Sequence, residues 1–200
     1  MDREYRLVSF DLETRKGPQD VGGWQQLKEG KGGVSLLIAH DSATDSYSFF
    51  DDHTLEYFAA LVAEDPDTVL VGYNSKEFDL PIVNALLGRR FPIRFHVDIF
   101  DLVKDALARE GRARERGWKL GDTALRAMGI TKPPLGAHAP ELAAQNRWAE
   151  LITYCRHDVD LTRSLMDYVR RHGGLADHDG SLLELDLPKW LRFRMQEIAA

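Results

Sequence analysis

The positions of apolar and polar residues divide the chain into short strand-like runs and longer helix-like stretches. Short apolar runs bounded by polar or turn-forming residues predict strands over 6–13, 34–40, 46–50, 68–73 and 93–98. Apolar positions at helical spacing predict helices over 54–64, 78–88, 100–110, 120–128 and 147–172. Two stretches rich in glycine, proline or other polar residues, 14–33 and 132–140, are expected to be loops.

The order of these elements predicts the fold class. Strands 34–40 and 46–50 are joined by a short polar turn, which favours a hairpin, and the later strands alternate with helices. We therefore expect an α/β fold with a mixed five-stranded sheet flanked by helices. The chain, 1–200, is expected to form a single domain, with a core over about 6–172 and a C-terminal extension over 173–200 that packs on this core.

The composition excludes several classes of protein. With 200 residues, 44% of them hydrophobic, the chain is typical of a globular domain. The single cysteine, Cys155, excludes an internal disulfide and a cysteine-cluster metal site. The apolar runs are too short to span a bilayer and the N-terminus lacks a signal-peptide pattern, so we expect a cytoplasmic location and no membrane partner. A net charge of −6 argues against binding nucleic acid mainly by bulk charge, but it permits binding through metal ions.

Two acidic residues stand at the end of the first predicted strand. Side chains alternate along a strand, so Asp11 and Glu13 share one face while Leu12 points to the other. Two carboxylates at this spacing can share a divalent cation. A solvated strand end would also explain them, because such triplets occur by chance in an acidic chain.

A third carboxylate lies within the apolar stripe of the longest predicted helix. At about 100° per residue, Asp158 falls on the same side as Leu151, Cys155 and Leu165. An unpaired carboxylate there would cost several kcal/mol or stay protonated, unless it meets a metal ion, a basic partner or a water-filled cleft. Tyr154 lies one turn earlier on the same side, so its phenol would reach the same cleft.

A fourth carboxylate, Asp79, precedes Pro81, which suits the first turn of a helix. The helix dipole alone would explain an acid at that position. Taken together, however, the four acids would repel one another in one cleft, and two divalent cations would compensate the charge. Ligands that are all oxygen atoms suit Mg²⁺ or Mn²⁺ rather than Zn²⁺.

The three acidic motifs, in this order, resemble those of the DEDD superfamily of 3′–5′ exonucleases, which has an RNase H-like fold. Asp11-Leu12-Glu13-Thr14 resembles the first motif, residues 72–81 with Phe78-Asp79-Leu80-Pro81 the second, and residues 154–158 the third. The Tyr-x-x-x-Asp form of the third motif is similar to the tyrosine (DEDDy) branch. The residues of the second and third motifs are most similar to those in the proofreading exonuclease domain of family B DNA polymerases.

The resemblance implies a role for each matching residue. Asp11, Glu13, Asp79 and Asp158 would bind two Mg²⁺ or Mn²⁺ ions, and Tyr154 would orient the attacking water. Asn74 and Phe78 would help to hold the terminal nucleotide, although they could equally be a turn former and a core residue. The implied activity is removal of nucleoside 5′-monophosphates from the 3′ end of single-stranded DNA. As no polymerase domain follows in this chain, a separate polymerase or repair partner is a possibility.

Two alternatives remain open from the sequence. An exoribonuclease of the RNase D type shares the Tyr-x-x-x-Asp arrangement and would act on an RNA 3′ end. A non-catalytic nucleic-acid-binding subunit could retain the same acids. Trp24, in the segment after the first motif, is a candidate base-stacking residue as well as a candidate packing residue. The basic stretch from Arg109 to Lys119 could follow a phosphate backbone or form a solvated face.

Overall fold

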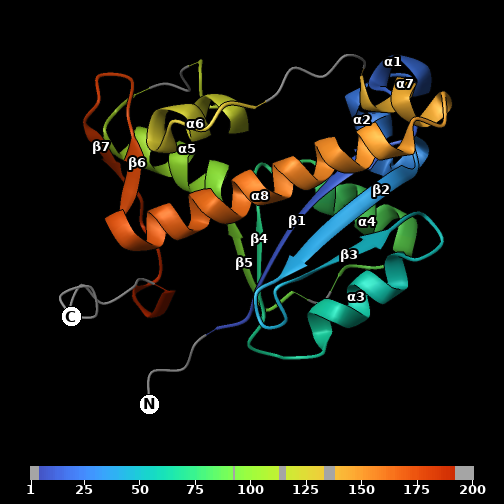
Figure 1. Ribbon diagram of the computed structural model, residues 1–200, viewed down its shortest axis with the longest axis horizontal. Helices are drawn as coiled ribbons and strands as arrows, with labels where there is room; N and C mark the ends of the chain where they lie inside the picture. Colours follow the sequence, from blue (N-terminus) through green and yellow to red (C-terminus); the bar gives the residue numbers. More distant parts are fainter. Residues whose placement is uncertain (1–4, 92, 113–115, 133–137, 192–200) are drawn as a thin grey trace.

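A mixed five-stranded sheet lies at the centre of the computed structural model, which describes residues 5–91, 93–112, 116–132 and 138–191 (Figure 1). The strand order is β3-β2-β1-β4-β5. The pairs β1–β2 and β2–β3 are antiparallel, whereas β1–β4 and β4–β5 are parallel. The strands are β1 (Leu7–Thr14), β2 (Val34–Asp41), β3 (Ser46–Phe50), β4 (Val69–Gly72) and β5 (Phe95–Asp98). The predicted α/β fold with a mixed five-stranded sheet is therefore confirmed, as is the β2–β3 hairpin.

Helices cover both faces of the sheet. The long helix α8 crosses one face, and α3 and α4 cover the other (Figure 1). These and the remaining helices are α3 (Leu55–Ala63), α4 (Asp79–Leu87), α5 (Ile99–Arg109), α6 (Leu120–Met128), α7 (Ala139–Ala144) and α8 (Trp148–His172). Among the described residues, none of the helices combines the length and apolar content that a bilayer crossing requires.

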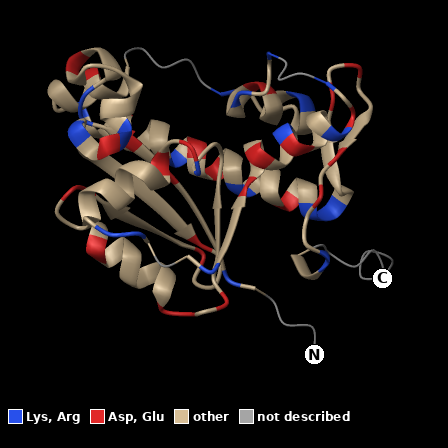
Figure 2. Ribbon diagram, turned by 180° about the vertical axis from the view of Figure 1, so that it is seen from behind, with Lys and Arg blue, Asp and Glu red and all other residues tan. Residues whose placement is uncertain are grey.

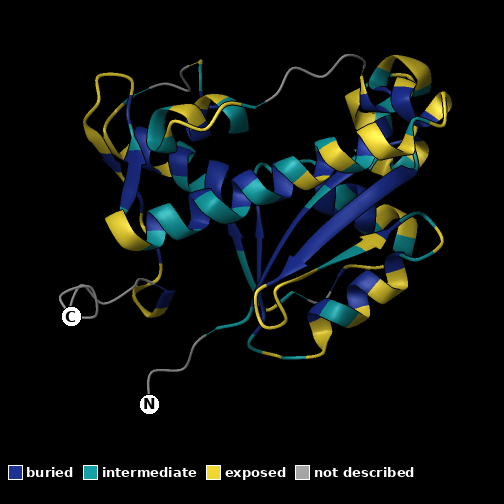
Figure 3. Ribbon diagram, in the orientation of Figure 1, coloured by how far each residue is buried: buried dark blue, intermediate teal, exposed yellow. Residues whose placement is uncertain are grey.

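The alternation of side chains along β1 separates two parts of the core. Val8, Phe10 and Leu12 pack with α3 and α4, whereas Leu7 packs on the opposite face of the sheet. The middle strands are buried along most of their length, and exposed residues lie on the outer sides of the helices (Figure 3). Asp11 and Glu13 share the parity of Leu7, so they face α8.

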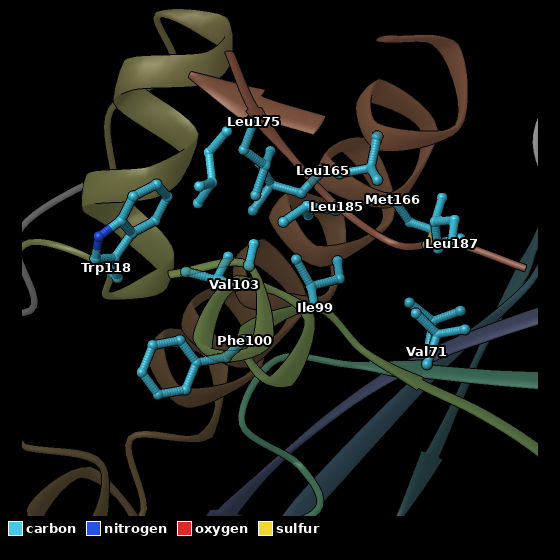
Figure 4. Close-up of a cluster of buried hydrophobic side chains, with 14 of the residues drawn as sticks. Val71, Ile99, Phe100, Val103, Trp118, Leu165, Met166, Leu175, Leu185 and Leu187 are labelled. Atoms are coloured by element: carbon cyan, nitrogen blue, oxygen red, sulfur yellow. The ribbon is translucent and has the colours of Figure 1, made fainter. Parts of the chain in front are cut away.

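The C-terminal part of the described chain packs beside β5. It forms a small hairpin of β6 (Gly174–Ala176) and β7 (Leu182–Glu184), followed by a short 3₁₀ turn, η2 (Lys189–Leu191). Leu175, Leu185 and Leu187 lie in one cluster with Val103 of α5 and Leu165 of α8 (Figure 4). Residues 192–200 of the expected extension lie outside the described residues.

The segment 14–33 is not a continuous loop, and this part of the sequence prediction was wrong. It contains two short helices and a π-helical turn, α1 (Pro18–Val21), α2 (Trp24–Gln26) and η1 (Leu27–Lys31). Pro18 takes the first position of α1, where its missing N–H costs nothing, and Leu27 is buried in the core under α4. A single buried leucine among polar residues gives too weak a periodicity to predict such a segment.

Candidate active site

Three carboxylates from two elements meet between β1 and α8. Carboxylate oxygens of Asp11, Glu13 and Asp158 all lie within 4.8 Å of one another. Asp11 and Glu13 come from the α8-facing side of β1, and Asp158 comes from the buried stripe of α8 that also holds Leu151 and Leu165. The structure thus brings together three of the four acids that the sequence singled out.

Asp79 adjoins this cluster from the other face of the sheet. It is the first residue of α4, and its Oδ1 accepts a hydrogen bond of 3.2 Å from the backbone N–H of Leu12, the residue between Asp11 and Glu13. Asp79 is not part of the group within 4.8 Å, but its charge raises the pKa of Asp11. The hydrogen bond therefore ties the second motif to the first.

The crowding of these acids changes their ionisation. Burial raises the pKa of Asp11 well above its usual range, and the charges of the neighbouring acids raise it further. Burial, followed by the charge of Asp158, raises the pKa of Glu13 to about 8. Burial raises the pKa of Asp79 to about 7. With its pKa at about 8, Glu13 keeps its proton at neutral pH when no metal ion is bound.

Lys132 lies at the edge of the cluster, a contact that the sequence analysis missed. Its Nζ donates to Asp158 Oδ2 at 2.6 Å and to the Tyr154 hydroxyl at 2.7 Å, and it sits 4.1 Å from the centre of the Tyr154 ring. Burial alone would lower the pKa of Lys132, but the attraction of Asp158 raises it. Lys132 precedes residues 133–137 of the expected loop, which lie outside the described residues, and no pattern in a single sequence reports where such a lysine will reach.

Tyr154 faces the same cluster, as its position one turn before Asp158 predicts. Burial raises the pKa of Tyr154, so the phenol keeps its proton at neutral pH. Because its oxygen accepts a hydrogen bond from Lys132, its own O–H remains available for another acceptor. Tyr154 and Lys132 also line a cavity of about 470 Å³ with Lys119, Leu120 and Thr131.

Asn74 and Phe78 lie in the turn between β4 and α4. The backbone N–H groups of Asn74 and Lys76 each donate to the Asp98 carboxylate at 2.8 Å. Asp98 also caps α5 by accepting from the backbone of Phe100. The buried Oδ1 of Asn74 has no hydrogen-bond partner among the described residues. Asp98 therefore fixes the turn, while the substrate roles of Asn74 and Phe78 remain predictions.

Two arginines of the basic stretch, Arg109 and Arg112, take part in local ion pairs. Arg112 binds Asp177 and Glu110, and Arg109 pairs with Asp186. Arg114 lies outside the described residues. Figure 2 shows acidic and basic residues interspersed over this part of the molecule. Arg109 and Arg112 are thus engaged in holding the β6–β7 region.

The fit of this cluster to a divalent metal rests on its donor atoms. Asp11, Glu13 and Asp158 supply oxygens close enough to share one ion, and oxygen is the donor that Mg²⁺ and Mn²⁺ prefer. Asp158 Oδ1 is buried and lacks a hydrogen-bond partner among the described residues, which leaves a lone pair for a cation. The donor set therefore fits a magnesium- or manganese-type ion.

Comparison with known proteins supports the fold. No family model and no curated protein matches the chain. Among solved structures, the fold is similar to the family B DNA polymerase of the hyperthermophilic archaeon Pyrobaculum calidifontis, with a TM-score of 0.64 and 20% sequence identity. The similarity covers 84% of this chain and 25% of the polymerase chain, so this chain spans about a quarter of that protein. At this identity the comparison establishes the fold, which is of the RNase H-like type as expected.

The hydrogen bonds of Asp98 predict a large loss of stability when its carboxylate is removed. Asp98→Ala would leave the part-buried N–H of Asn74 and the buried N–H of Phe100 without this acceptor and should lower the free energy of unfolding by about 3 kcal/mol. Urea unfolding would measure this, with the exposed Asp105→Ala on the same helix as control. Equal midpoints for the two variants would contradict the assigned role.

The raised pKa values predict that the metal-free protein loses stability as pH rises. In the folded state Glu13 binds a proton up to about pH 8, whereas in the unfolded chain it releases that proton near its ordinary pKa, so unfolding becomes easier between the two values. Between about pH 6.5 and pH 8, the free energy of unfolding in EDTA should fall by about 2 kcal/mol. Asp79, whose pKa burial raises to about 7, contributes to the fall in the lower part of this window, whereas His96, whose pKa burial lowers to about 4, does not titrate in it.

Urea unfolding across this window, repeated with Glu13→Gln, tests the prediction. The variant should lose much of the slope, because its amide does not titrate. A wild-type stability that is flat or rises with pH over the same interval would show that Glu13 is not buried among like charges.

Proposed function

We propose that this chain is a metal-dependent 3′–5′ exonuclease that hydrolyses the terminal phosphodiester of single-stranded DNA and releases nucleoside 5′-monophosphates. The observation that carries the proposal is the meeting of Asp11, Glu13 and Asp158 within 4.8 Å, with the Tyr154 hydroxyl alongside. The three motifs that resemble the tyrosine branch of the DEDD exonucleases supply these residues. The fold is also similar to that of a family B DNA polymerase, which supports a role in acting on nucleic acid.

In this proposal the four acids hold two Mg²⁺ or Mn²⁺ ions. Asp11, Glu13 and Asp158 are the nearest ligands, and Asp79 contributes from the start of α4. Bound divalent ions would lower the pKa of a water molecule and stabilise charge on the attacking and leaving oxygens. Acids that repel one another while empty give up their protons when a cation binds, so binding should be tighter as pH rises.

The remaining residues position the water and the substrate. Tyr154 accepts a hydrogen bond from Lys132 and directs its own O–H toward the attacking water, which it orients. The ammonium of Lys132 is held by Asp158 and adds positive charge beside the phosphate to be cleaved. Asn74 and Phe78 hold the terminal nucleotide. The water would attack the phosphorus that joins the last two nucleotides, and the bond from this phosphorus to the 3′ oxygen of the preceding nucleotide would break. That oxygen takes up a proton, and the terminal nucleotide leaves as a nucleoside 5′-monophosphate.

Loss of one metal ligand should abolish this activity without unfolding the protein. Asp11→Ala and Asp158→Asn should each lower the rate of oligonucleotide digestion at least about 100-fold, since metal ions contribute several kcal/mol to the transition state. Circular dichroism should show the wild-type fold, because removing one buried like charge relieves repulsion. Asp167→Asn, on the partly exposed side of the same helix, should digest at the wild-type rate.

The measurement is a ladder of 5′-labelled DNA and RNA oligonucleotides with Mg²⁺, Mn²⁺ or EDTA. Stepwise shortening of DNA in the presence of metal supports the proposal, and preferential shortening of RNA would instead assign an exoribonuclease. A wild-type protein that leaves every 3′ end intact would refute it and would favour a non-catalytic nucleic-acid-binding role.

A further inference from the structure

A large aromatic side chain stands exposed beside the candidate site. Trp24 is 63% exposed, and its ring lies edge-on to Phe78 with 6.1 Å between the ring centres and 71° between the ring planes. Phe78 directly precedes Asp79, whose carboxylate accepts from the backbone of Leu12 in the first motif. The two rings therefore lie at the start of α4, next to the point where Asp79 binds β1.

The segment that carries Trp24 is anchored to the rest of the molecule. Leu27, three residues later, is 1% exposed and packs in the core with residues of α4. Farther along, a Cβ at Gly30 would come within 3.3 Å of the Ala85 side chain, and the φ of +80° at this position favours glycine as well, so glycine suits this close approach to α4. The exposure of Trp24 is thus a feature of a packed segment.

The backbone conformation just before Trp24 fixes the position from which its side chain extends into solvent. Gly22 and Gly23 have φ angles of +91° and +112°, in the region that favours glycine. The N–H of Gly23 donates to the carbonyl of Pro18 at 2.7 Å, and the carbonyl of Gly23 accepts from Leu27 at 3.1 Å. These bonds set where α2 begins and leave the indole in water, next to Phe78.

The site therefore has two walls of different chemistry. Tyr154 and Lys132 lie on the α8 side, where Lys132 donates to both the Tyr154 hydroxyl and Asp158. Phe78 and Trp24 lie on the α4 side and offer ring surfaces. Exposed ring surface next to a phosphodiester-cleaving centre suits an unpaired base, because every base has a face that stacks on an aromatic ring.

We infer that Trp24, which lies against the Phe78 ring that holds the terminal nucleotide, forms a stacking subsite for the unpaired base next to that nucleotide. This inference rests on the proposed function, because it takes single-stranded nucleic acid as the substrate. It assigns Trp24 to substrate binding and to the preference for single strands, since a base that is paired in a duplex does not offer its face to the ring. Stacking tolerates any base, so the subsite reads strandedness and not sequence.

The test compares Trp24→Ala with Trp24→Phe. The control is Tyr57→Ala, which removes an aromatic side chain on α3 that is 70% exposed, similar to Trp24. Fluorescence anisotropy measures the affinity of each variant for a short 5′-fluorescein-labelled thymidine oligonucleotide, in Ca²⁺ and in EDTA, beside a blunt duplex. Trp24→Ala should weaken binding of the single strand about 5- to 100-fold. Trp24→Phe should restore most of the affinity, and Tyr57→Ala should match the wild type.

Activity separates this subsite from the acidic centre. Trp24→Ala should raise the KM for the oligonucleotide by a similar factor, while kcat and the hydrolysis of thymidine 5′-p-nitrophenyl phosphate, which has no second base, stay within about twofold of the wild type. If the wild type binds single strands through Trp24 but cleaves neither substrate, the proposed function fails and the subsite stands.

Three results would overturn the inference. In the first, Trp24→Ala binds single strands as tightly as Tyr57→Ala does. In the second, Trp24→Ala weakens the binding of duplex and of single strand equally. In the third, the wild type binds no single strand in either Ca²⁺ or EDTA. Self-association that Trp24→Ala abolishes, with unchanged oligonucleotide affinity, would assign the ring to a contact between two copies of this chain and would overturn the inference as well.

Discussion

Repulsion among closely spaced carboxylates governs the chemistry of this molecule. β1 and α8 bring carboxylate oxygens of Asp11, Glu13 and Asp158 within 4.8 Å of one another. Burial and this proximity raise the pKa values of Asp11 and Glu13, so these groups hold protons that they would release in water. Such an arrangement is stable only if each acid is held by an element whose other contacts are strong. Here the apolar face of α8 and the buried strand β1 supply those contacts, so the acids cannot move apart to relieve the repulsion.

Two kinds of cation, Lys132 and a divalent metal ion, would reduce this repulsion in different ways. Lys132 reaches Asp158 from a segment outside the sheet and holds Tyr154 at the same time. It compensates one negative charge and leaves Asp158 Oδ1 buried without a partner among the described residues. A divalent ion between Asp11, Glu13 and Asp158 would compensate the rest and release their protons. The charges of the acidic cluster, of Lys132 and of a bound ion therefore depend on one another, and Tyr154 is tied to them through Lys132.

Much of this arrangement follows from local patterns in the sequence. The alternation in β1 separates Asp11 and Glu13 from Leu12, and helical periodicity puts Asp158 in the buried stripe of α8. Both features depend on the geometry of a single element, so a sequence is enough to predict them. The helix Leu120–Met128 was predicted with the bounds that the structure has, because Gly129 ends it in the left-handed conformation.

What escaped prediction depends on tertiary contacts. Lys132 is an ordinary lysine next to a proline-rich loop until the fold carries it to α8. The 14–33 segment reads as a loop because Leu27 is its main buried apolar anchor. Asp98 ends β5 and binds the turn that carries Asn74, a link between neighbouring parallel strands that no spacing within either strand records.

The most direct test of this account is anomalous diffraction from crystals of the wild-type protein grown in Mn²⁺. We predict two manganese peaks, about 3.5–4 Å apart, bounded by carboxylate oxygens of Asp11, Glu13, Asp158 and Asp79. Carboxylates in the same positions with no manganese between them, and with Lys132 as the cation bound to Asp158, would contradict it.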